Sequence, residues 1–296
     1  MHRRICLTGL LLLFTWNAFA ATPRSKHIFV IILENQSYER VVGSSNAPYL
    51  NSLIPKGALA TQFYATVHGS QLVRQYLYAG VGISDSVTTC FTENNLVRQM
   101  LPLALQWKSY NEDLPSIGSW LVSYNNYVRR HNVLTDWSDT CASSQRYYSV
   151  PFTDSAHGFW HDASNHTFVN FNDIDPHLGN DMHSPTTNPG LAIRNGDSWL
   201  KSHVPAILSQ PYFQTGGDGQ LWIMFDEGNI YPTVDSRHGG GRVMVLLLGP
   251  KAAKGYRSGT FHNDQNLLRT WGISMGFATL PGGATKAGAL GELFVH

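Results

Sequence analysis

The sequence predicts an α/β protein in which helices cover both faces of one mostly parallel sheet. Two observations indicate this fold class. Apolar runs such as "LWIMF" at 221–225 and "VMVLLLGP" at 243–250 are continuous rather than alternating, as in strands buried on both faces. Strands and helices are also expected to alternate toward both ends of the chain, which favours a layered α/β fold.

The expected elements follow from these apolar patterns. Strands are predicted at 27–33, 60–66, 106–110, 220–225 and 242–248, and helices at 47–54, 94–105, 198–208 and 263–272. The segment from about 116 to 189 is rich in Asn, Asp, His, Ser and aromatic residues and has weak periodicity. We expect it to form an irregular, cap-like insertion whose aromatic residues either fill its core or line a pocket for a lipid head group. A single domain is expected over residues 21–296.

The first twenty residues have the pattern of a secretory signal peptide. Arg3 and Arg4 precede a mostly apolar run from 7 to 16, and Ala18-Phe19-Ala20 forms a cleavage site. The run is shorter than the ~20 residues that span a bilayer, so no stable membrane insertion is expected. We expect cleavage after Ala20 and a secreted or periplasmic protein.

The composition of the remaining chain restricts its partners and its redox state. Without the signal it carries 19 Lys and Arg against 20 Asp and Glu, a formal charge of −1 that argues against a nucleic-acid partner. Cys90 and Cys141 form an even pair in a chain bound for an oxidising compartment, which favours a disulfide between them.

Polar residues follow two of the predicted strands directly. Glu34 and Asn35 end the first strand, and Asp226 and Glu227 end the strand at 220–225. The carboxyl ends of parallel strands share one edge of a sheet, where three carboxylates would repel each other unless a cation or protons offset their charge. Oxygen ligands suit Mg, Ca or Mn, and nearby histidines would extend the choice to Zn or Fe. The alternative is that these residues only cap helices or form turns.

Ser70 is the candidate nucleophile. In "YATVHGSQLVRQYLYAG" at 64–80 it lies between a strand and a helix, where helix N-terminal amides receive an anion such as phosphate. The alternative is a simple helix N-cap. Ser70 is not in a G-x-S-x-G elbow, and the chain has no G-x-x-x-x-G-K-[ST] or H-E-x-x-H motif, which argues against an α/β-hydrolase, a P-loop enzyme and a zincin.

The ordered motifs resemble a known family. The segments are "HIFVIILENQSYERVVG", "GALATQFYATVHGS", "WKSYNEDLP", "RRHN", "NDMH", "LWIMFDEG" and "GYRSGTFHNDQNLLRT", which together span most of the chain. They are similar to the bacterial phosphoesterase family of acid phosphatases and phospholipases C, within the alkaline phosphatase-like superfamily. The resemblance implies a three-layer αβα fold and a secreted, metal-dependent phosphoesterase, with a phosphomonoesterase expected first and a phospholipase C-type enzyme as the alternative.

The resemblance also implies roles for particular residues. Glu34, Asn35, Asp226 and Glu227 would hold one divalent metal ion, and Ser70 would become transiently phosphorylated. His131 and His183 would lie at the phosphate or leaving-group side, with Asp181 supporting one of them. Further substrate contacts are expected from His68, Arg74, Asn132 and His262, although the sequence departs from the family pattern after Ser70, at Val133 and at Phe261.

Two other classes of function fit the same residues. The carboxylates could form a glycosidase pair that needs no metal, and loss of activity on metal chelation would separate this reading from a metal-dependent one. The chain could also be a non-catalytic protein that binds phosphate or a metal, in which case Ser70 would never react.

Overall fold

An eight-stranded sheet forms the centre of the computed structural model, which describes residues 21–295. The strands lie in the order β10-β2-β9-β8-β1-β7-β3-β6, and β9 alone among these eight runs antiparallel to its neighbours. Their bounds are β1 (Ile28–Leu33), β2 (Ala58–Tyr64), β3 (Trp107–Asn111), β6 (Ser149–Pro151), β7 (Phe171–Asp175), β8 (Gln220–Phe225), β9 (Arg242–Leu248) and β10 (Arg257–Asn263). The predicted mostly parallel sheet is therefore confirmed.

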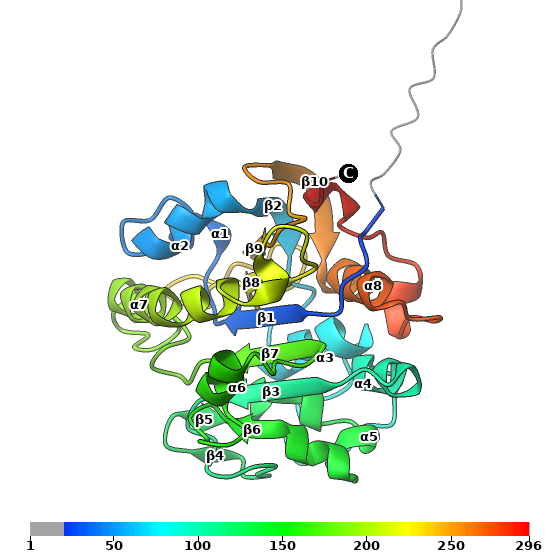
Figure 1. Cartoon of the computed structure of the whole chain (residues 1–296). Helices are drawn as coiled ribbons and strands as arrows, with labels where there is room; N and C mark the ends of the chain where they lie inside the picture. The colour runs from blue at the N-terminus through cyan, green and yellow to red at the C-terminus, as the bar shows by residue number, and fades with distance from the viewer. Residues whose placement is uncertain (1–20, 296) are drawn as a thin grey trace, which may run out of the picture.

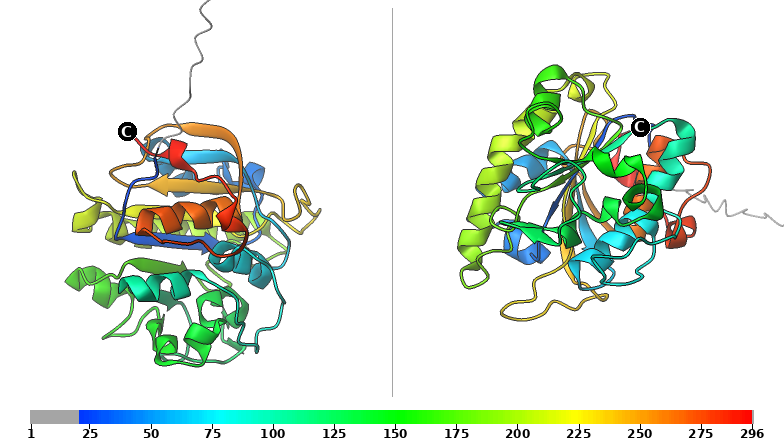
Figure 2. Two further views of the ribbon diagram at one scale, coloured as in Figure 1. Left: turned by 90° about the vertical axis from the view of Figure 1, so that its right-hand side faces the viewer. Right: turned by 90° about the horizontal axis from the view of Figure 1, so that it is seen from below.

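Helices cover the two faces of this sheet and give three layers (Figures 1 and 2). On one face lie α1 (Tyr38–Val41), α2 (Pro48–Leu53) and α7 (Pro189–Leu208), with α2 packed on α7. On the other lie α3 (Ser70–Ala79), α4 (Leu96–Met100) and α8 (Asp264–Met275), with α8 in contact with both α3 and α4. The described part of the chain also contains the short helices α5 (Ser138–Cys141) and α6 (Phe159–Asn165), a hairpin of β4 (Ser123–Tyr124) and β5 (Tyr127–Val128), and several 3-10 turns.

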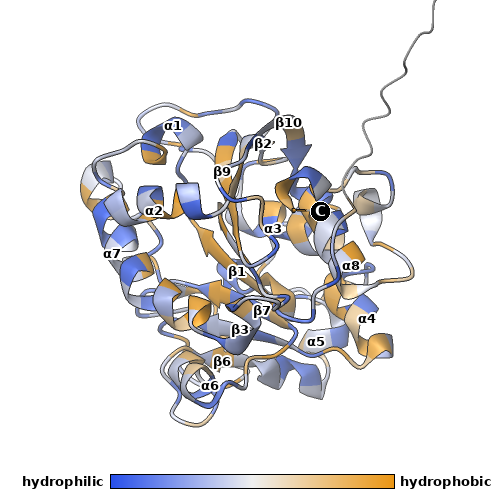
Figure 3. Cartoon of the chain, turned by 45° about the horizontal axis from the view of Figure 1, so that its top comes forward, coloured by the Kyte–Doolittle hydropathy of each residue, from blue (hydrophilic) through white to orange (hydrophobic). Residues whose placement is uncertain are grey.

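The apolar strands in the middle of the sheet form the core. Every residue of β1 and β8 is buried, because helices cover both faces and other strands flank both edges. Figure 3 shows the same pattern, with the hydrophobic colour concentrated on the central strands and the hydrophilic colour on outward helix faces. Burial of one such Leu, Ile or Phe side chain contributes roughly 1.5–3 kcal/mol, so these two strands anchor the fold.

The middle segment differs from the predicted cap in one respect. It supplies β6 and β7 to the main sheet, and β7 lies inside the sheet, between β1 and β3, rather than above it. The sequence of β7, "FNDID", lacks the apolar pattern of a buried strand, because Asp173 and Asp175 lie on one of its two faces and are both buried. The edge strand β10 was also missed, because Gly259 and its polar neighbours lack an apolar run.

The predicted disulfide is present. Cys90 and Cys141 are bonded, with their Cα atoms 6.1 Å apart, and the nearby residues Phe91 and Trp137 form a parallel β-bridge. The disulfide joins the segment after α3 to the last residue of α5. Within residues 21–295, no helix is long and apolar enough to cross a membrane. The predicted signal peptide, residues 1–20, lies outside the described residues.

Candidate active site

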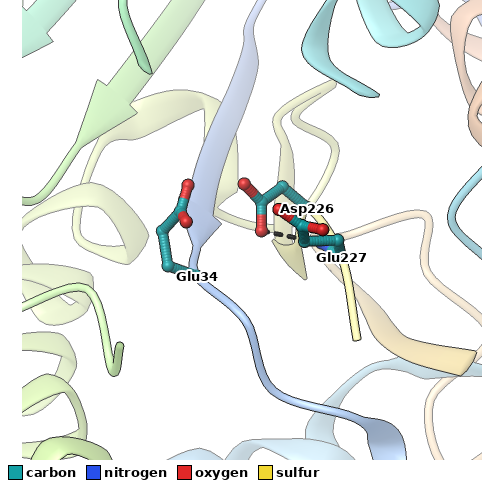
Figure 4. A group of neighbouring side chains, drawn as sticks. All are labelled: Glu34, Asp226 and Glu227. Carbon is teal, nitrogen blue, oxygen red and sulfur yellow. Dashed lines mark hydrogen bonds between the residues drawn. The ribbon is translucent and has the colours of Figure 1, made fainter. Parts of the chain in front are cut away.

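The register of the central strands brings the predicted acidic residues together. Leu33 of β1 pairs with Phe225 of β8, so the residues that follow them, Glu34 and Asp226, leave the sheet at the same edge. The backbone N–H of Asp226 donates to the carbonyl of Leu33 at 3.0 Å, which fixes the two chain exits side by side. Figure 4 shows Glu34 from one strand facing Asp226 and Glu227 from the other.

Glu34, Asp226 and Glu227 form a buried carboxylate cluster. Each offers an oxygen within 4.8 Å of the others, and all three residues are at most 3% exposed. Burial raises the pKa of Asp226, and the nearby charge of Glu34 raises it further. Burial opposes the ionisation of Glu34 as well, but His131, a hydrogen bond with Asp226 and the guanidinium of Arg74 hold its pKa well below the usual range. The cluster therefore needs positive charge or a bound proton to be stable.

The donor set fits a divalent cation. The side-chain oxygens Asn35 Oδ1 and Asp226 Oδ2 are buried and have no hydrogen-bond donor among the described residues. Buried acceptors normally have a partner, and a hard cation is a natural one for oxygens that face a carboxylate cluster. The residues that would hold it are Glu34, Asn35, Asp226 and Glu227, the four predicted from the sequence.

Ser70 lies beside this cluster as the first residue of α3. Its hydroxyl donates to Glu34 Oε2 at 3.0 Å, and the residue is 7% exposed. Gly69 precedes it with φ +104°, a conformation that only glycine adopts readily, and its backbone N–H donates to Glu227 Oε2 at 3.1 Å. Beyond Ser70, the backbone N–H groups of the first helical turn have no acceptor within the helix and are available to an anion.

The His68 side chain contacts Glu227 and holds it in place. Its Nδ1 lies at a short hydrogen-bond distance from Glu227 Oε2, and its Nε2 lies 2.9 Å from the carbonyl oxygen of Asp235. Both partners are oxygens that accept hydrogen bonds, so each can receive an N–H of the imidazole. The hydrogen bond that His68 donates to Glu227 raises the pKa of His68.

Three consecutive glycines hold the two halves of the site together. Gly240 donates to the carbonyl of Ala65 at 2.9 Å and accepts from the N–H of Gly228 at 2.7 Å, so it connects the chain after β2 to the chain after β8. A Cβ atom at Gly240 would collide with the carbonyl oxygen of Val67, and Gly239 and Gly241 have φ of +104° and +90°. The sequence offered no account of this run. The glycines allow the backbone segments after β2 and β8 to approach each other closely next to Glu227 and Ser70.

Arg74 lies one turn after Ser70 and is fully buried. Its guanidinium contacts the carboxylate of Asp175, donates to Glu34 Oε1 at 3.1 Å and lies 3.7 Å from Asp226 Oδ2. The expected role was a contact with substrate phosphate. The geometry instead makes Arg74 a counter-ion for protein carboxylates, because its charge is surrounded by three of them. Asp175, its partner on β7, was not among the predicted site residues.

The two candidate catalytic histidines occupy different environments. His131 is 4% exposed, and its Nε2 lies 2.9 Å from Glu34 Oε1 without the alignment of a hydrogen bond; burial lowers its pKa. His183 has a side chain 19% exposed, and its Nδ1 lies 3.0 Å from Asn35 Nδ2. Asp181 holds His183 through the backbone, since its Oδ1 accepts the His183 N–H at 2.9 Å.

Two predicted substrate contacts lie elsewhere. The amide of Asn132 donates to Ser149 Oγ at 2.8 Å and to the Tyr127 hydroxyl at 3.2 Å, and the residue is fully buried. His262 lies on the edge strand β10, where its Nε2 is 2.6 Å from Glu292 Oε1. Among the described contacts, neither side chain meets the carboxylate cluster or Ser70. Each instead satisfies a polar group within the fold.

The fold and this site define a class of protein. Among solved structures, a protein of the alkaline phosphatase superfamily from Vibrio parahaemolyticus matches with a TM-score of 0.59 and 15% identity, covering 87% of this chain and 68% of that one. Murine ectonucleotide pyrophosphatase/phosphodiesterase 5 matches with a TM-score of 0.58 and 10% identity, covering 92% of this chain and 100% of that one. At such identities the likeness shows the fold, which is alkaline phosphatase-like.

Sequence comparison gives the family. Residues 44–274 match the Phosphoesterase family, and the chain belongs to it. It is 30% identical over 196 residues to the phosphatidylinositol-3-phosphatase of Mycobacterium tuberculosis, covering 65% of this chain and 61% of that protein. It is 26% identical over 261 residues to a probable acid phosphatase of Kluyveromyces lactis, covering 82% of this chain and 56% of that protein. The chain thus spans about three fifths of the length of these curated relatives.

Proposed function

We propose that the protein is a metal-dependent phosphoesterase of the phosphomonoesterase type, in which Ser70 is transiently phosphorylated. The observation that carries this proposal is the position of the Ser70 hydroxyl, 3.0 Å from a carboxylate of a buried three-carboxylate cluster and at the start of a helix. Membership of the Phosphoesterase family supports it, and both curated relatives are named as phosphatases.

The side chains divide the reaction between them. Glu34 Oε2 orients the Ser70 hydroxyl and accepts its proton as Oγ attacks phosphorus in line, which forms the Ser70–phosphate bond as the bond to the leaving oxygen breaks. The free N–H groups of the first turn of α3 receive the phosphoryl oxygens. His183, the more exposed of the two histidines, protonates the leaving oxygen, and water then hydrolyses the phosphoserine.

The remaining residues keep the nucleophile and its surroundings in place. Glu34, Asn35, Asp226 and Glu227 would hold the cation, which when bound lowers the pKa of the serine hydroxyl and offsets negative charge on the phosphoryl group. His68 fixes Glu227, and Arg74 fixes Glu34 and Asp226. His131 is buried beside Glu34, and burial lowers its pKa.

Replacement of Ser70 tests this function. We expect Ser70→Ala to lower kcat for 4-nitrophenyl phosphate by at least about a thousandfold, because covalent catalysis and the oriented nucleophile are both lost. Melting temperature in the presence of the metal serves as the control for folding. Mass spectrometry of acid-quenched wild-type protein should find phosphate on Ser70. Normal turnover by Ser70→Ala, or a phosphate carried on another residue, would contradict the assignment.

We also infer that the protein works outside the cytoplasm. The Cys90–Cys141 disulfide supports this inference, because such bonds persist in oxidising compartments. The signal-like pattern of residues 1–20 supports it further. Amino-terminal sequencing of protein recovered from the periplasm or medium should begin at Ala21, and recovery of uncleaved protein in the cytoplasm alone would refute the inference.

A further inference from the structure

The edge of the sheet opposite the candidate active site carries a cluster of basic side chains. Strands β1, β8 and β2 begin at this edge and the antiparallel β9 ends there, because β1 pairs in parallel with β8 and β9 lies between β8 and β2. Figure 1 shows β1 running away from this edge, so the site residues that follow β1 lie at the other end of the strand. Five cationic residues lie just outside these strand ends, and we call them the basic edge: Arg24, Lys26, Lys56, Lys251 and Lys254.

Contacts between the segments make the basic edge one continuous surface. Lys251 Nζ donates to the carbonyl oxygen of Arg24 at 3.5 Å. Arg24 and Lys26 line one hollow, and Lys56 and Lys254 line a second. Neighbouring strands lie ~4.8 Å apart, so the ends of these four adjacent strands span only about 15 Å. The five charges therefore present themselves together to any partner that meets this edge.

The positive charge of the basic edge has no counter-ion in the described chain. Within residues 21–295, no carboxylate lies within 4 Å of the side-chain nitrogens of its five members. Asp218 lines the same hollow as Arg24 and Lys26, but its Oδ1 lies 2.8 Å from His27 Nδ1 and its Oδ2 accepts the backbone N–H of Lys26 at 2.7 Å. Residues 21–296 as a whole have a slight excess of acid, so this edge is a local concentration of positive charge.

Apolar side chains lie among these cations. The hollow beside Arg24 and Lys26 is also lined by Leu103, Leu105 and Met275, and Leu103 is 43% exposed. Its volume is about 300 Å³, against ~30 Å³ for one water molecule, so it has room for a phosphate head group. Exposed cations next to exposed apolar surface suit a bilayer that contains anionic lipids, whereas nucleic-acid sites combine cations with hydrogen-bonding side chains.

We propose that the basic edge docks the protein on a membrane surface that contains anionic lipids. Arg24 and Lys26 receive a lipid phosphate in their hollow, the three lysines of the other segments contact neighbouring head groups, and Leu103 enters the boundary between head groups and acyl chains. In this orientation the carboxyl ends of the parallel strands, and Ser70 with them, face away from the bilayer. The docking itself does not depend on any reaction at Ser70.

Co-sedimentation with lipid vesicles tests the docking. We expect the protein to sediment with vesicles of equal parts phosphatidylglycerol and phosphatidylcholine, and to stay in solution with vesicles of phosphatidylcholine alone. About 0.5 M NaCl should release it, because salt screens exposed charges. Equal binding to both vesicles, or binding to neither, would overturn the proposal. Binding to single-stranded DNA in place of the anionic vesicles would also overturn it and would assign the edge to a nucleic acid. None of these measurements requires a variant to fold.

A pair of double variants tests which surface makes the contact. Lys26→Gln with Lys254→Gln removes two exposed charges from the basic edge and should weaken binding to the anionic vesicles roughly thirtyfold, since each basic residue near such a surface contributes roughly fivefold. Arg194→Gln with Lys201→Gln removes the same charge from exposed positions on α7 and should bind as the wild type does. An equal loss in both variants would contradict the proposal, because net charge alone would then explain the binding.

Turnover on the vesicles tests the orientation and separates this proposal from the proposed function. Protein bound to anionic vesicles should hydrolyse 4-nitrophenyl phosphate as fast as free protein, because Ser70 faces away from the lipid. Inhibition by the vesicles would place the contact at the active-site edge and overturn the proposal. Absence of hydrolysis with and without vesicles would instead refute the phosphoesterase function, while sedimentation with the anionic vesicles would still support the docking.

Discussion

Glu34 has more partners than any other residue of the candidate site. Oε2 receives the Ser70 hydroxyl and the Asn35 amide, each at 3.0 Å, while Oε1 faces Arg74 and His131. One carboxylate thus contacts Ser70, Asn35, Arg74 and His131 together. A substitution of Glu34 would disturb all of these contacts at once, so a substitution of Ser70 is the better test of the proposed function.

The sequence identifies His262 as a titratable residue in a polar motif, but it does not show which residue His262 contacts. A histidine in a polar motif predicts a site role, but the side chain meets Glu292, thirty residues later in the chain. Ser258 Oγ donates to the same Glu292 oxygen at 2.8 Å. This trio attaches the C-terminal segment to the edge strand β10. We therefore expect this trio to affect the free energy of unfolding.

The Glu292 carboxylate should make stability depend on pH. Burial raises the pKa of Glu292, but hydrogen bonds from His262 and Ser258 outweigh it and leave the pKa below the ordinary 4.5. A lowered carboxyl pKa contributes stability that is complete above about pH 4.5 and is lost as pH falls through the folded value. We expect Glu292→Gln to reduce the free energy of unfolding by about 1–2 kcal/mol at pH 6.

Urea unfolding of wild type and Glu292→Gln at a series of pH values provides the measurement. The difference between the two proteins should shrink steadily below pH 4.5. A difference that stays constant down to the acid limit of folding would show that the carboxylate charge contributes nothing. Turnover of 4-nitrophenyl phosphate by folded Glu292→Gln distinguishes this stabilising role from the substrate contact first expected for His262.

Among the structural elements, β7 and α3 are coupled through buried charge. Arg74 on α3 contacts Asp175 at the end of β7, and Asp173 two residues earlier accepts from the Tyr78 hydroxyl of the same helix at 2.7 Å. Burial, together with the neighbouring Asp175, raises the pKa of Asp173 well above its usual range. The helix that carries Ser70 is thereby fastened to the sheet along its length.

A double-mutant cycle on Arg74 and Asp175 measures this coupling. We expect Arg74→Met to lower the free energy of unfolding by about 3–5 kcal/mol, because it leaves carboxylates buried without a partner. Adding Asp175→Asn should cost much less than the sum of the single effects, since the unpaired charge is then removed. Arg24→Met, which removes an arginine from an exposed position before β1, is the matched control. Additive effects in urea unfolding would refute the coupling.

The sequence predicts the elements that make the carboxylate cluster better than those that surround it. Strands β1 and β8 are continuous apolar runs followed by acids, which predicts both strands and the shared edge at which they end. The register that pairs Leu33 with Phe225 comes from the structure. Strand β7 was missed because its inward-facing residues are Asp173 and Asp175, whose partners come from α3. Pairings between residues about one hundred positions apart leave no local pattern, so the role of Arg74 emerges only from the fold.

At the scale of the whole molecule, the site should link cation binding to stability. A ligand that binds only the folded state adds free energy of unfolding, about 2.7 kcal/mol at one hundred times its dissociation constant. We expect the melting temperature to rise by roughly 5 °C when Mg²⁺, Ca²⁺, Mn²⁺ or Zn²⁺ is added to chelator-treated protein. The ion with the largest effect identifies the preferred cation.

The matched variant for this experiment is Asp226→Asn combined with Glu227→Gln. It removes two charges from the cluster while keeping side-chain shape, so its melting temperature should not respond to the same ions. Wild-type protein that responds to none of the four ions would refute the metal site. An equal response in wild type and variant would place the ion elsewhere on the molecule.

The order in which the chain is made has a consequence for when this centre first exists. Glu34 and Ser70 are synthesised early, but Asp226, Glu227 and the glycine bridge at 239–241 follow more than 150 residues later. A ribosome that has produced two thirds of the polypeptide has therefore not yet made the residues that complete the carboxylate cluster. If the proposed function is right, a chain released before Glu227 has been made should have no phosphoesterase activity.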